Sequence, residues 1–321
     1  MSDFAIDIRN VVKRYGDHVA VKDLSLQVPR GVVYGLLGPN GAGKTTTIRM
    51  ILNIIAPDEG TIDVLGAPSN DPRASDRIGY LPEERGLYRN MKVHDVLQFL
   101  GELRGMTRQA ADRQIDHWLE RLSLKTPDKD WGQSKVAELS RGMQQKVQFI
   151  GTLLHEPDLV ILDEPFSGLD PINAQALKDT VVELRKRGTT VIFSTHMMDN
   201  AERLCDSVCI IARGEKVLDG SIASVKTAHG GKHIALALSS EAQAGVTTVL
   251  SDRSLIANVD DQNQFFELEL APDATPQRLL ERLVAAGAPI TRFELVQPSL
   301  HQIFLHTVGA DGVEEGMSGQ G

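Results

Sequence analysis

The sequence contains no apolar stretch long enough to cross a membrane as a helix. A membrane-spanning helix needs about 18 or more consecutive apolar residues, and no run in the 321-residue chain approaches that length. The start, Met1-Ser2-Asp3-Phe4, also lacks the basic and then apolar form of a secretory signal. We therefore expect the chain to stay in the cytoplasm, either free or docked on a membrane protein.

Cysteine and excess positive charge are also scarce. The two cysteines, Cys205 and Cys209, are too few for a disulfide framework, and without further ligands they make no zinc site. We interpret them as small packing residues. The net charge of −9 disfavours a general nucleic-acid binder, so no nucleic-acid partner is expected.

The length and composition are those of a soluble protein with two domains. The chain is 41% hydrophobic and 24% charged, which is ordinary for globular proteins, and 321 residues exceed the usual size of one domain. We find no internal repeat, and low complexity only at the C-terminal end. A single small domain is therefore not expected.

The first part of the chain predicts an α/β domain with a β-rich start and a helical insertion. Two apolar runs, 159–162 and 190–193, flank a helical stretch at 174–187. A strand-helix-strand order of this kind predicts parallel strands. The other expected elements are strands at 4–12, 19–28 and 32–37, a helix at 45–55, helices within about 90–155, and a closing hairpin of 208–211 with 216–218.

The pattern changes near residue 222, where we place a domain boundary. Residues 223–308 predict a small α+β domain with strands at 266–270 and 290–296 and helices at 279–284 and 300–305. Glycine-rich residues 309–321 predict a disordered tail. His229 and His233 have the spacing of a metal pair on a helix, but Gly230-Gly231 between them argues against one.

A phosphate-binding loop follows the strand at 32–37. Gly, four free positions and then Gly-Lys-Thr let backbone N–H groups converge on phosphate oxygens, while the lysine reaches the β- and γ-phosphates and the threonine hydroxyl ligates Mg²⁺. The following helix would direct its positive end at the phosphates. The residues are Gly38, Pro39, Asn40, Gly41, Ala42, Gly43, Lys44 and Thr45, followed by Thr46.

Two carboxylates end the apolar strand at 159–162. Asp163 and Glu164 are placed where open α/β sheets carry their ligand chemistry. Asp163 can hold Mg²⁺, directly or through water, and Glu164 can orient or deprotonate an attacking water. A solvated acidic turn is the alternative interpretation, which the phosphate loop disfavours.

The sequence contains three further motifs, and the combined order of all five motifs is specific. They are Leu-Ser-Arg-Gly-Met-Gln-Gln-Lys at 139–146, Phe-Ser-Gly-Leu-Asp at 166–170 and Ser-Thr-His at 194–196. With the phosphate loop and Asp-Glu-Pro, this order resembles the nucleotide-binding subunit of ABC transporters over roughly the first 220 residues. The resemblance implies a P-loop NTPase fold, ATP and Mg²⁺ as cofactors, and two chains that sandwich two ATP molecules.

The resemblance also implies roles for single residues. Ser140 and Gly142 begin a helix whose N-terminal end contacts ATP bound to the opposite subunit. Asp170 links the two sites across the dimer, His196 is similar to the histidine that contacts the γ-phosphate, and Tyr15 stands where an aromatic ring meets adenine. For Tyr15, packing in the core is the alternative.

The chain departs from the family pattern in two places. Glu83 replaces the usual glutamine; a carboxylate can still ligate Mg²⁺ or position water, but it cannot donate an amide N–H. Arg141 and Met143 replace a glycine and a glutamine. Since Ser140 and Gly142 remain, we expect the anion site at this helix end to survive.

The resulting expectation is an ATPase that dimerises with a second copy or a paralogous subunit and powers a separate transmembrane permease. Similarity to bacterial sodium- and drug-efflux ATPases favours export. Residues 83–91 are expected either to dock the membrane subunit or to be simple core. The alternatives are an importer ATPase with a regulatory C-terminal domain, an ABC ATPase that acts on ribosomes or DNA, and a binding module without catalysis.

Overall fold

The computed structural model describes residues 3–84, 86–229, 233–239, 244–261 and 264–308. It contains two compact units, of which the first includes Met1–Ile222 and the second is Ala223–Thr307. The tail expected at 309–321 lies outside the described residues. No helix within these ranges is both long and apolar enough to cross a bilayer.

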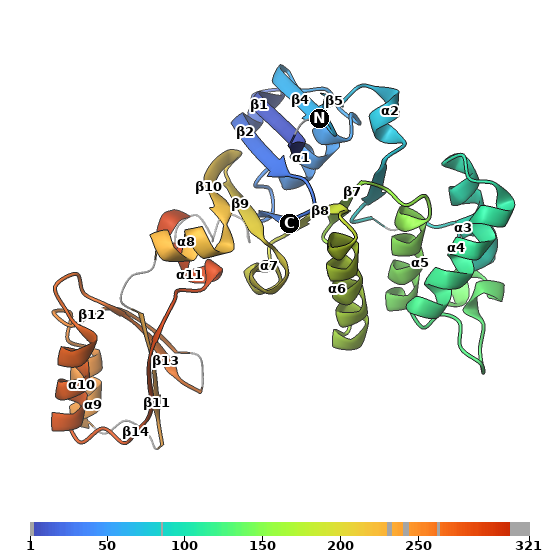
Figure 1. Ribbon diagram of the computed structural model, residues 1–321. Helices are drawn as coiled ribbons and strands as arrows, with labels where there is room; N and C mark the ends of the chain where they lie inside the picture. The colour runs from blue at the N-terminus through green and yellow to red at the C-terminus, as the bar shows by residue number, and fades with distance from the viewer. Residues whose placement is uncertain (1–2, 85, 230–232, 240–243, 262–263, 309–321) are drawn as a thin grey trace. The chain divides into compact units, whose positions relative to one another are not determined.

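A six-stranded sheet forms the centre of the first unit (Figure 1). Five of its strands are parallel and β10 closes one edge as an antiparallel hairpin with β9. Strands β3 and β7 are buried along their whole length, as expected for continuous apolar runs in a covered parallel sheet. In spatial order the strands are β10 (Glu215–Ser221), β9 (Ser207–Ala212), β3 (Val33–Leu37), β8 (Thr190–Thr195), β7 (Leu159–Asp163) and β6 (Ile78–Leu81).

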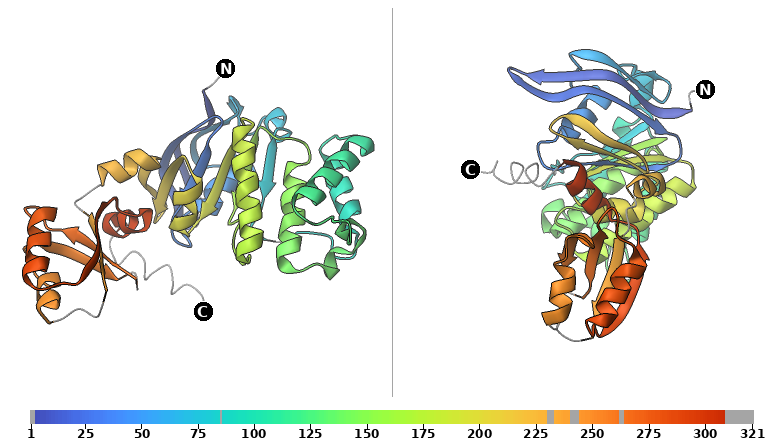
Figure 2. Two further views of the ribbon diagram at one scale, coloured as in Figure 1. Left: turned by 60° about the horizontal axis from the view of Figure 1, so that its bottom comes forward. Right: turned by 90° about the vertical axis from the view of Figure 1, so that its left-hand side faces the viewer.

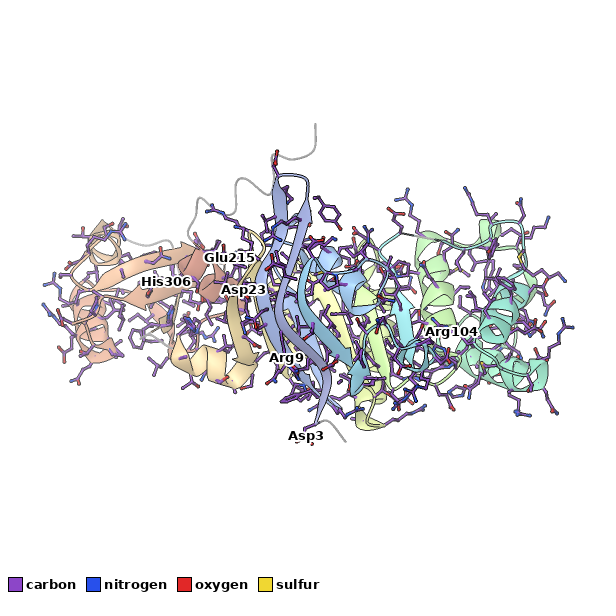
Figure 3. The ribbon with its side chains drawn as sticks, turned by 90° about the horizontal axis from the view of Figure 1, so that it is seen from above. Asp3, Arg9, Asp23, Arg104, Glu215 and His306 are labelled. Carbon is purple, nitrogen blue, oxygen red and sulfur yellow. The ribbon has the colours of Figure 1, made fainter. Side chains whose placement is uncertain are left out.

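A four-stranded antiparallel sheet precedes it and confirms the β-rich start. Its outer face is polar: Arg9 is exposed there and pairs with Asp7 and Asp63 (Figure 3). The strands run longer than the sequence predicts, because β1 and β2 pair through to the tight turn at Gly16. In spatial order they are β2 (His18–Pro29), β1 (Phe4–Tyr15), β4 (Glu59–Val64) and β5 (Ala67–Pro68).

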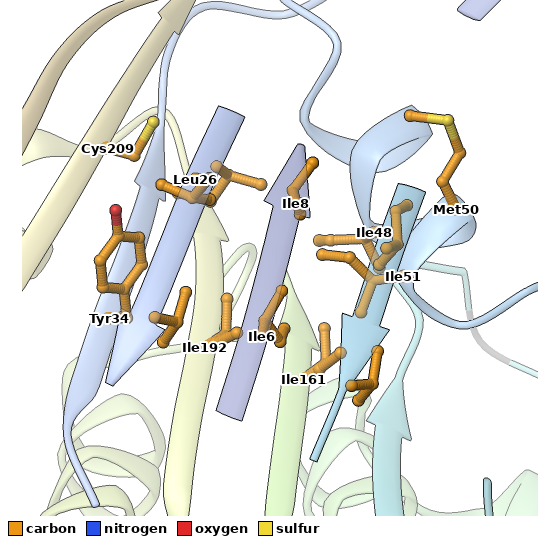
Figure 4. Packing of buried hydrophobic residues seen from close by; sticks show 14 of the residues in the cluster. Ile6, Ile8, Leu26, Tyr34, Ile48, Met50, Ile51, Ile161, Ile192 and Cys209 are labelled. Atoms are coloured by element: carbon orange, nitrogen blue, oxygen red, sulfur yellow. The ribbon is translucent and has the colours of Figure 1, made fainter. Parts of the chain in front are cut away.

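Helix α1 (Lys44–Ile51) fills the space between the two sheets (Figure 4). Ile48 and Ile51 pack with Ile8 of β1 and Ile161 of β7 in one buried cluster. The helix is shorter than the expected 45–55, because Asn53 adopts a positive φ of 53° and leads the chain out of the helix. Asparagine accepts this left-handed conformation more readily than most residues.

Helices cover the remaining faces of the first unit. Between 90 and 155, α3, α4 and α5 gather into a group next to β6, drawn in green in Figures 1 and 2. Ile115, Trp118, Leu119 and Leu122 have the i, i+3, i+4 and i+7 spacing of one helix face, and all four are buried. The helices are α2 (Pro72–Ser75), α3 (Val93–Leu103), α4 (Arg108–Arg121), α5 (Arg141–Leu153), α6 (Pro171–Lys186) and α7 (Met198–Leu204), with short 3-10 turns η1 (Trp131–Gln133) and η2 (Val136–Glu138).

The second unit is an antiparallel sheet of four strands with its own core. Ile234, Leu236 and Leu268 of the sheet pack with Leu279 and Leu283 of α10. The sequence predicts only two of the strands and two of the helices. In sheet order the strands are β12 (Ile256–Asp261), β13 (Phe266–Leu270), β11 (His233–Leu238) and β14 (Ile290–Val296), and the helices are α8 (Ile222–Ala228), α9 (Ala244–Leu250), α10 (Pro276–Ala285) and α11 (Leu300–Val308).

The two histidines considered as a metal pair do not share a helix. His229 follows α8, and His233 begins β11, where it is buried opposite Glu269. Burial lowers the pKa of His233. Residues 230–232 between them lie outside the described part of the chain.

Candidate active site

The phosphate loop joins the end of β3 to the start of α1, as its pattern predicts. Gly43 occupies the N-cap position of α1 with a φ of 105°, and a Cβ there would lie 2.5 Å from the carbonyl oxygen of Ala20. Gly38 likewise has a positive φ and faces the carbonyl of Ile211 too closely for any side chain. Only glycine fits both positions.

Lys44 is a buried cation held against this loop. Its Nζ donates to the carbonyl oxygens of Gly38 at 2.8 Å and Pro39 at 2.9 Å. Burial lowers the pKa of Lys44, and the negative charges of Glu164, Asp163 and Glu83 partly offset this effect. A bound phosphate would add further negative charge beside this ammonium and so favour its charged form.

Asp163 ends β7 and has one carboxylate oxygen engaged and one free. Oδ1 accepts a hydrogen bond from the Ser194 hydroxyl, which itself accepts from the backbone N–H of Glu164 at 3.1 Å. Asp163 is 1% exposed, and its Oδ2 has no hydrogen-bond partner among the described residues. A buried carboxylate oxygen without a donor is suited to a cation, because a hard divalent ion prefers such oxygens.

Glu164 and His196 form a hydrogen-bonded pair across the ends of β7 and β8. Glu164 Oε1 accepts from the backbone N–H of His196 at 3.1 Å and lies 2.8 Å from His196 Nδ1, while Oε2 accepts from the Thr195 hydroxyl at 3.3 Å. An ionised carboxylate only accepts, so this contact assigns the proton to Nδ1. About four acceptor directions exist on a carboxylate, which leaves room for a water molecule.

These residues surround one cavity of about 650 Å³. Tyr15 stands at its edge, 49% exposed, with the Lys13 ammonium 5.7 Å from the ring centroid. Tyr15 is therefore no core residue, although its role toward adenine stays a prediction. The lining residues are Tyr15, His18, Ala20, Asn40, Gly41, Gly43, Lys44, Thr45, Thr46, Glu83, Asp163, Glu164, Ser167 and His196.

Some predicted residues do not line the cavity, and others that do were missed. Gly38 and Pro39 act through their carbonyls on Lys44, and Ala42 is buried. The sequence reasoning missed the neighbours of Tyr15 on β2, His18 and Ala20. Pairing of β1 with β2 around the Gly16 turn was the signal that could have found them, as Tyr15 pairs with His18. Ser167 and Ser194 lay within recognised motifs but were given no role.

Ser140, Gly142 and Asp170 lie away from this cavity and next to one another. Ser140 caps α5, its Oγ accepting from the N–H of Met143 at 3.3 Å. Asp170 caps α6 in the same way through the N–H of Asn173 at 3.0 Å, a hydrogen bond that lowers the pKa of Asp170. A Cβ on Gly142 would lie 2.7 Å from Asn173 Nδ2. The two helix starts are thus packed together, with Ser140 and Asp170 both exposed.

The segment at 83–91, expected either to dock a membrane subunit or to be core, has features of both. Leu87 and Met91 are half-buried, as core residues would be. Tyr88 is 53% exposed and packs edge-on against Phe99 of α3, with ring centroids 5.8 Å apart. Arg85 lies outside the described residues. An exposed aromatic pair therefore accompanies partly buried neighbours.

Comparison with known proteins agrees with this geometry. Residues 21–167 match the family described as ABC transporter, and residues 220–308 match the family described as ATP-binding protein DrrA1-3-like, C-terminal domain. The chain is 42% identical over 305 residues to the uncharacterized ABC transporter ATP-binding protein YhaQ of Bacillus subtilis (strain 168), covering 95% of this chain and 99% of that protein.

A second relative and a solved structure extend the comparison. The linearmycin resistance ATP-binding protein LnrL of Bacillus subtilis is 33% identical over 314 residues, covering 95% of this chain and 98% of that protein. The structure of CbiO1 from Clostridium perfringens, part of the ABC transporter complex CbiONQ, is similar with a TM-score of 0.62 at 26% identity, covering 70% of this chain and 92% of that one. The phosphate loop, the paired carboxylates and these similarities show that the chain belongs to the ATP-binding proteins of ABC transporters, the subunits that bind and hydrolyse ATP.

Proposed function

We propose that this cavity binds Mg-ATP and hydrolyses it to power a separate membrane permease that exports its substrate. One observation carries the proposal: a single cavity brings together Lys44, Asp163, Glu164 and His196, which come from three separate segments of the chain. A buried ammonium, a carboxylate with a free oxygen and a hydrogen-bonded base are the groups that phosphoryl transfer to water requires. A binding module without catalysis needs no such base.

The chain's own residues divide the work. Lys44 neutralises phosphate charge, and the loop N–H groups together with Asn40, Gly41, Gly43 and Thr46 cradle the phosphates. Glu164 accepts the proton of the attacking water, while the Nδ1–H of His196 holds the carboxylate in place. Tyr15 provides an aromatic face for the adenine ring at the edge of the cavity.

Mg²⁺ fits the residues at this site. No group of three potential ligand side chains of His, Cys, Asp or Glu occurs among the described residues, so the protein holds no complete metal cage of its own there. Mg²⁺ is commonly held by one or two carboxylates plus substrate phosphates and water. Asp163, Thr45 and Glu83 would hold it, and when bound it would neutralise charge on the phosphates.

The site would be completed by a second copy of the chain or a paralogous subunit. Ser140 and Gly142 lie outside the cavity at an exposed helix start, where free N–H groups and the helix dipole favour an anion. We assign them to the ATP of the opposite subunit and Asp170 to the contact between the two sites. ATP bound across the interface would favour the closed dimer, and a coupled permease would respond to that change.

The two units would divide these tasks. Every residue that lines the cavity belongs to the first unit, so we assign ATP binding to residues 1–222, with the helical part at 90–155, and an accessory role to residues 223–308. Export is supported by the name of the LnrL relative, a resistance protein that matches nearly the whole chain. The partner is then a permease in the membrane, with this chain on its inner face.

The direct test is ATP hydrolysis by a Glu164→Gln variant. Removing a general base lowers turnover by about 10²- to 10⁴-fold, while ATP binding should persist because the phosphate loop is untouched. Glu215→Gln is the matched control, since it makes the same chemical change at an exposed carboxylate of β10 paired with Lys22 (Figure 3). Unchanged phosphate release by Glu164→Gln would overturn the assignment of the base.

A further inference from the structure

Strand β6 lies at the edge of the parallel sheet, and α5 packs along it. An edge strand presents unpaired carbonyl groups on its outer side. Two side chains reach such carbonyls. His155, just after α5, lies 3.2 Å from the carbonyl oxygen of Ile78. The Thr152 hydroxyl of α5 lies 3.3 Å from the carbonyl oxygen of Tyr80 and 3.1 Å from that of Gln148. Polar side chains of α5 thus follow the edge of β6.

The third contact in this row reaches beyond the strand to the active site. Gln148, one turn before Thr152, donates through Nε2 to the carbonyl oxygen of Glu84 at 3.1 Å. Glu84 is bonded directly to Glu83, which lines the ATP cavity. Both glutamates are exposed, and they follow the end of β6 at Leu81. One buried amide therefore holds the segment that carries Glu83.

We infer that Gln148 is a positioning residue for Glu83, which it fixes at the cavity by holding the adjacent carbonyl against α5. The inference rests on the proposed function, because Glu83 matters only if the cavity hydrolyses ATP. It assigns Gln148 no contact with substrate. Its effect on catalysis must pass entirely through Glu83.

The energetics of Gln148 favour positioning over simple packing. The side chain is 8% exposed, and its Oε1 has no hydrogen-bond partner among the described residues. A buried acceptor without a donor opposes folding, so an apolar side chain of similar size would suit a purely structural position at least as well. The amide gains its one described bond from the segment next to Glu83.

Gln148→Met removes the amide and keeps the volume of the side chain. Because Glu84 is an exposed residue, water can then bond to its carbonyl oxygen, so the melting temperature should stay the same or rise. We expect kcat to fall about fivefold to tenfold, the range of one lost hydrogen bond. KM for ATP should change little, because Tyr15 and the phosphate loop are unaffected.

The decisive experiment is a double-mutant cycle on the full chain with Glu83→Ala, followed by phosphate release with Mg-ATP. If Gln148 acts through Glu83, Gln148→Met lowers kcat in the parent chain and has no further effect once Glu83 is alanine. Thr152→Val is the matched control: it removes another α5 hydrogen bond to the β6 edge, and its effect should multiply with that of Glu83→Ala.

Three results would overturn the inference. They are full kcat in Gln148→Met, an independent loss in the double variant, and no effect of Glu83→Ala where Gln148→Met has one. The parent chain and Glu164→Gln are measured in the same series. Failure of the parent to hydrolyse ATP, or full activity of Glu164→Gln, contradicts the proposed function, and is thereby distinguished from a failure of the Gln148 assignment alone.

Discussion

Three consecutive residues at the end of β8 and just after it hold the two carboxylates of the site. Ser194 joins Asp163 to the backbone of Glu164, and Thr195 and His196 hold the Glu164 carboxylate. Groups that are already oriented need little rearrangement when charge develops in the transition state. The site therefore depends on the end of β8 as much as on the end of β7.

The lowered pKa of Lys44 predicts a pH dependence of ATP binding. A phosphate favours the charged ammonium, so ATP binding raises this pKa and takes up protons at pH values above the lowered pKa of the free chain. ATP affinity should fall as the pH rises through that value, which lies below the usual 10.5. Calorimetry in two buffers with different ionisation enthalpies measures the uptake.

Folding stability should change with pH in the opposite direction to ATP affinity. Because the folded chain without nucleotide holds the Lys44 proton less tightly than the unfolded chain, its stability should rise with pH between the lowered pKa and 10.5. Lys44→Gln removes both slopes. Affinity for ATP that stays level up to pH 10.5 would contradict the lowered pKa of Lys44. The same slope in Lys44→Gln would show that another group titrates.

Two glycines of the phosphate loop should differ in their cost of substitution. Gly41 has a φ of 77° with open space around it, so Gly41→Ala should lower the free energy of unfolding by about 1–2 kcal/mol, the penalty for a left-handed side chain. Gly43→Ala adds a collision with the Ala20 carbonyl and should cost more. Urea unfolding of both variants without nucleotide checks this, and equal costs would contradict the described loop geometry.

The sequence alone could predict which motif residues belong to the site, because each motif is a short continuous segment. The order of glycines, Lys44 and the two carboxylates is visible in the sequence, and the structure places them around one cavity. His18 and Ala20 could not be found in this way, since they reach the cavity through the pairing of β2 with β1. Ser194 needed the register of β7 and β8, in which it pairs with Asp163.

At the scale of elements, a comparison of two helix caps can distinguish an effect on stability from an effect on ATP turnover. Ser140 caps α5 and Thr107 caps α4, each accepting a backbone N–H three residues on, at 3.3 Å. Replacing either by alanine should lower the free energy of unfolding by about 1 kcal/mol. Only Ser140→Ala should also lower ATP turnover, because only this helix start is proposed to meet the opposite ATP.

Thermal unfolding and phosphate release of the two cap variants are measured side by side. Equal turnover in Ser140→Ala and Thr107→Ala would reduce Ser140 to a structural cap. A selective loss in Ser140→Ala together with similar melting temperatures supports its role toward the nucleotide.

The predictability of each element followed the strength of its pattern. Strands β3, β7 and β8 are continuous apolar runs and were predicted. Strand β6 is only four residues long and was missed, as was β11, where alanines weaken the β signal. Continuous apolar segments can thus be identified from the sequence, whereas a very short strand such as β6 or an alanine-rich strand such as β11 depends on its tertiary partners.

At the scale of the whole molecule, two separate cores accompany the change in sequence pattern near residue 222. The cluster around α1 draws only on residues up to Ile211, and the cluster of the second unit begins at Ile234. The motifs identify the chemistry of the first unit. We find no comparable motif in the second unit, so its proposed accessory role could not be derived from its residues.

A single chain presents Lys44 and Glu164 at the cavity but Ser140 away from it, and the proposed sharing of the site between two chains requires this arrangement. The central claim is that a second chain supplies the other half. A Glu164→Gln variant should retain ATP and therefore hold the closed state, since a ligand that favours one state shifts the population toward it.

Light scattering of Glu164→Gln after gel filtration, with and without Mg-ATP, measures this most directly. The expected result is a mass of 35.1 kDa without nucleotide and twice that value with Mg-ATP. Adding Ser140→Ala to the variant should shift the species back toward the single chain. A mass of one chain with ATP bound, at protein concentrations well above those used to measure phosphate release, would contradict the shared site.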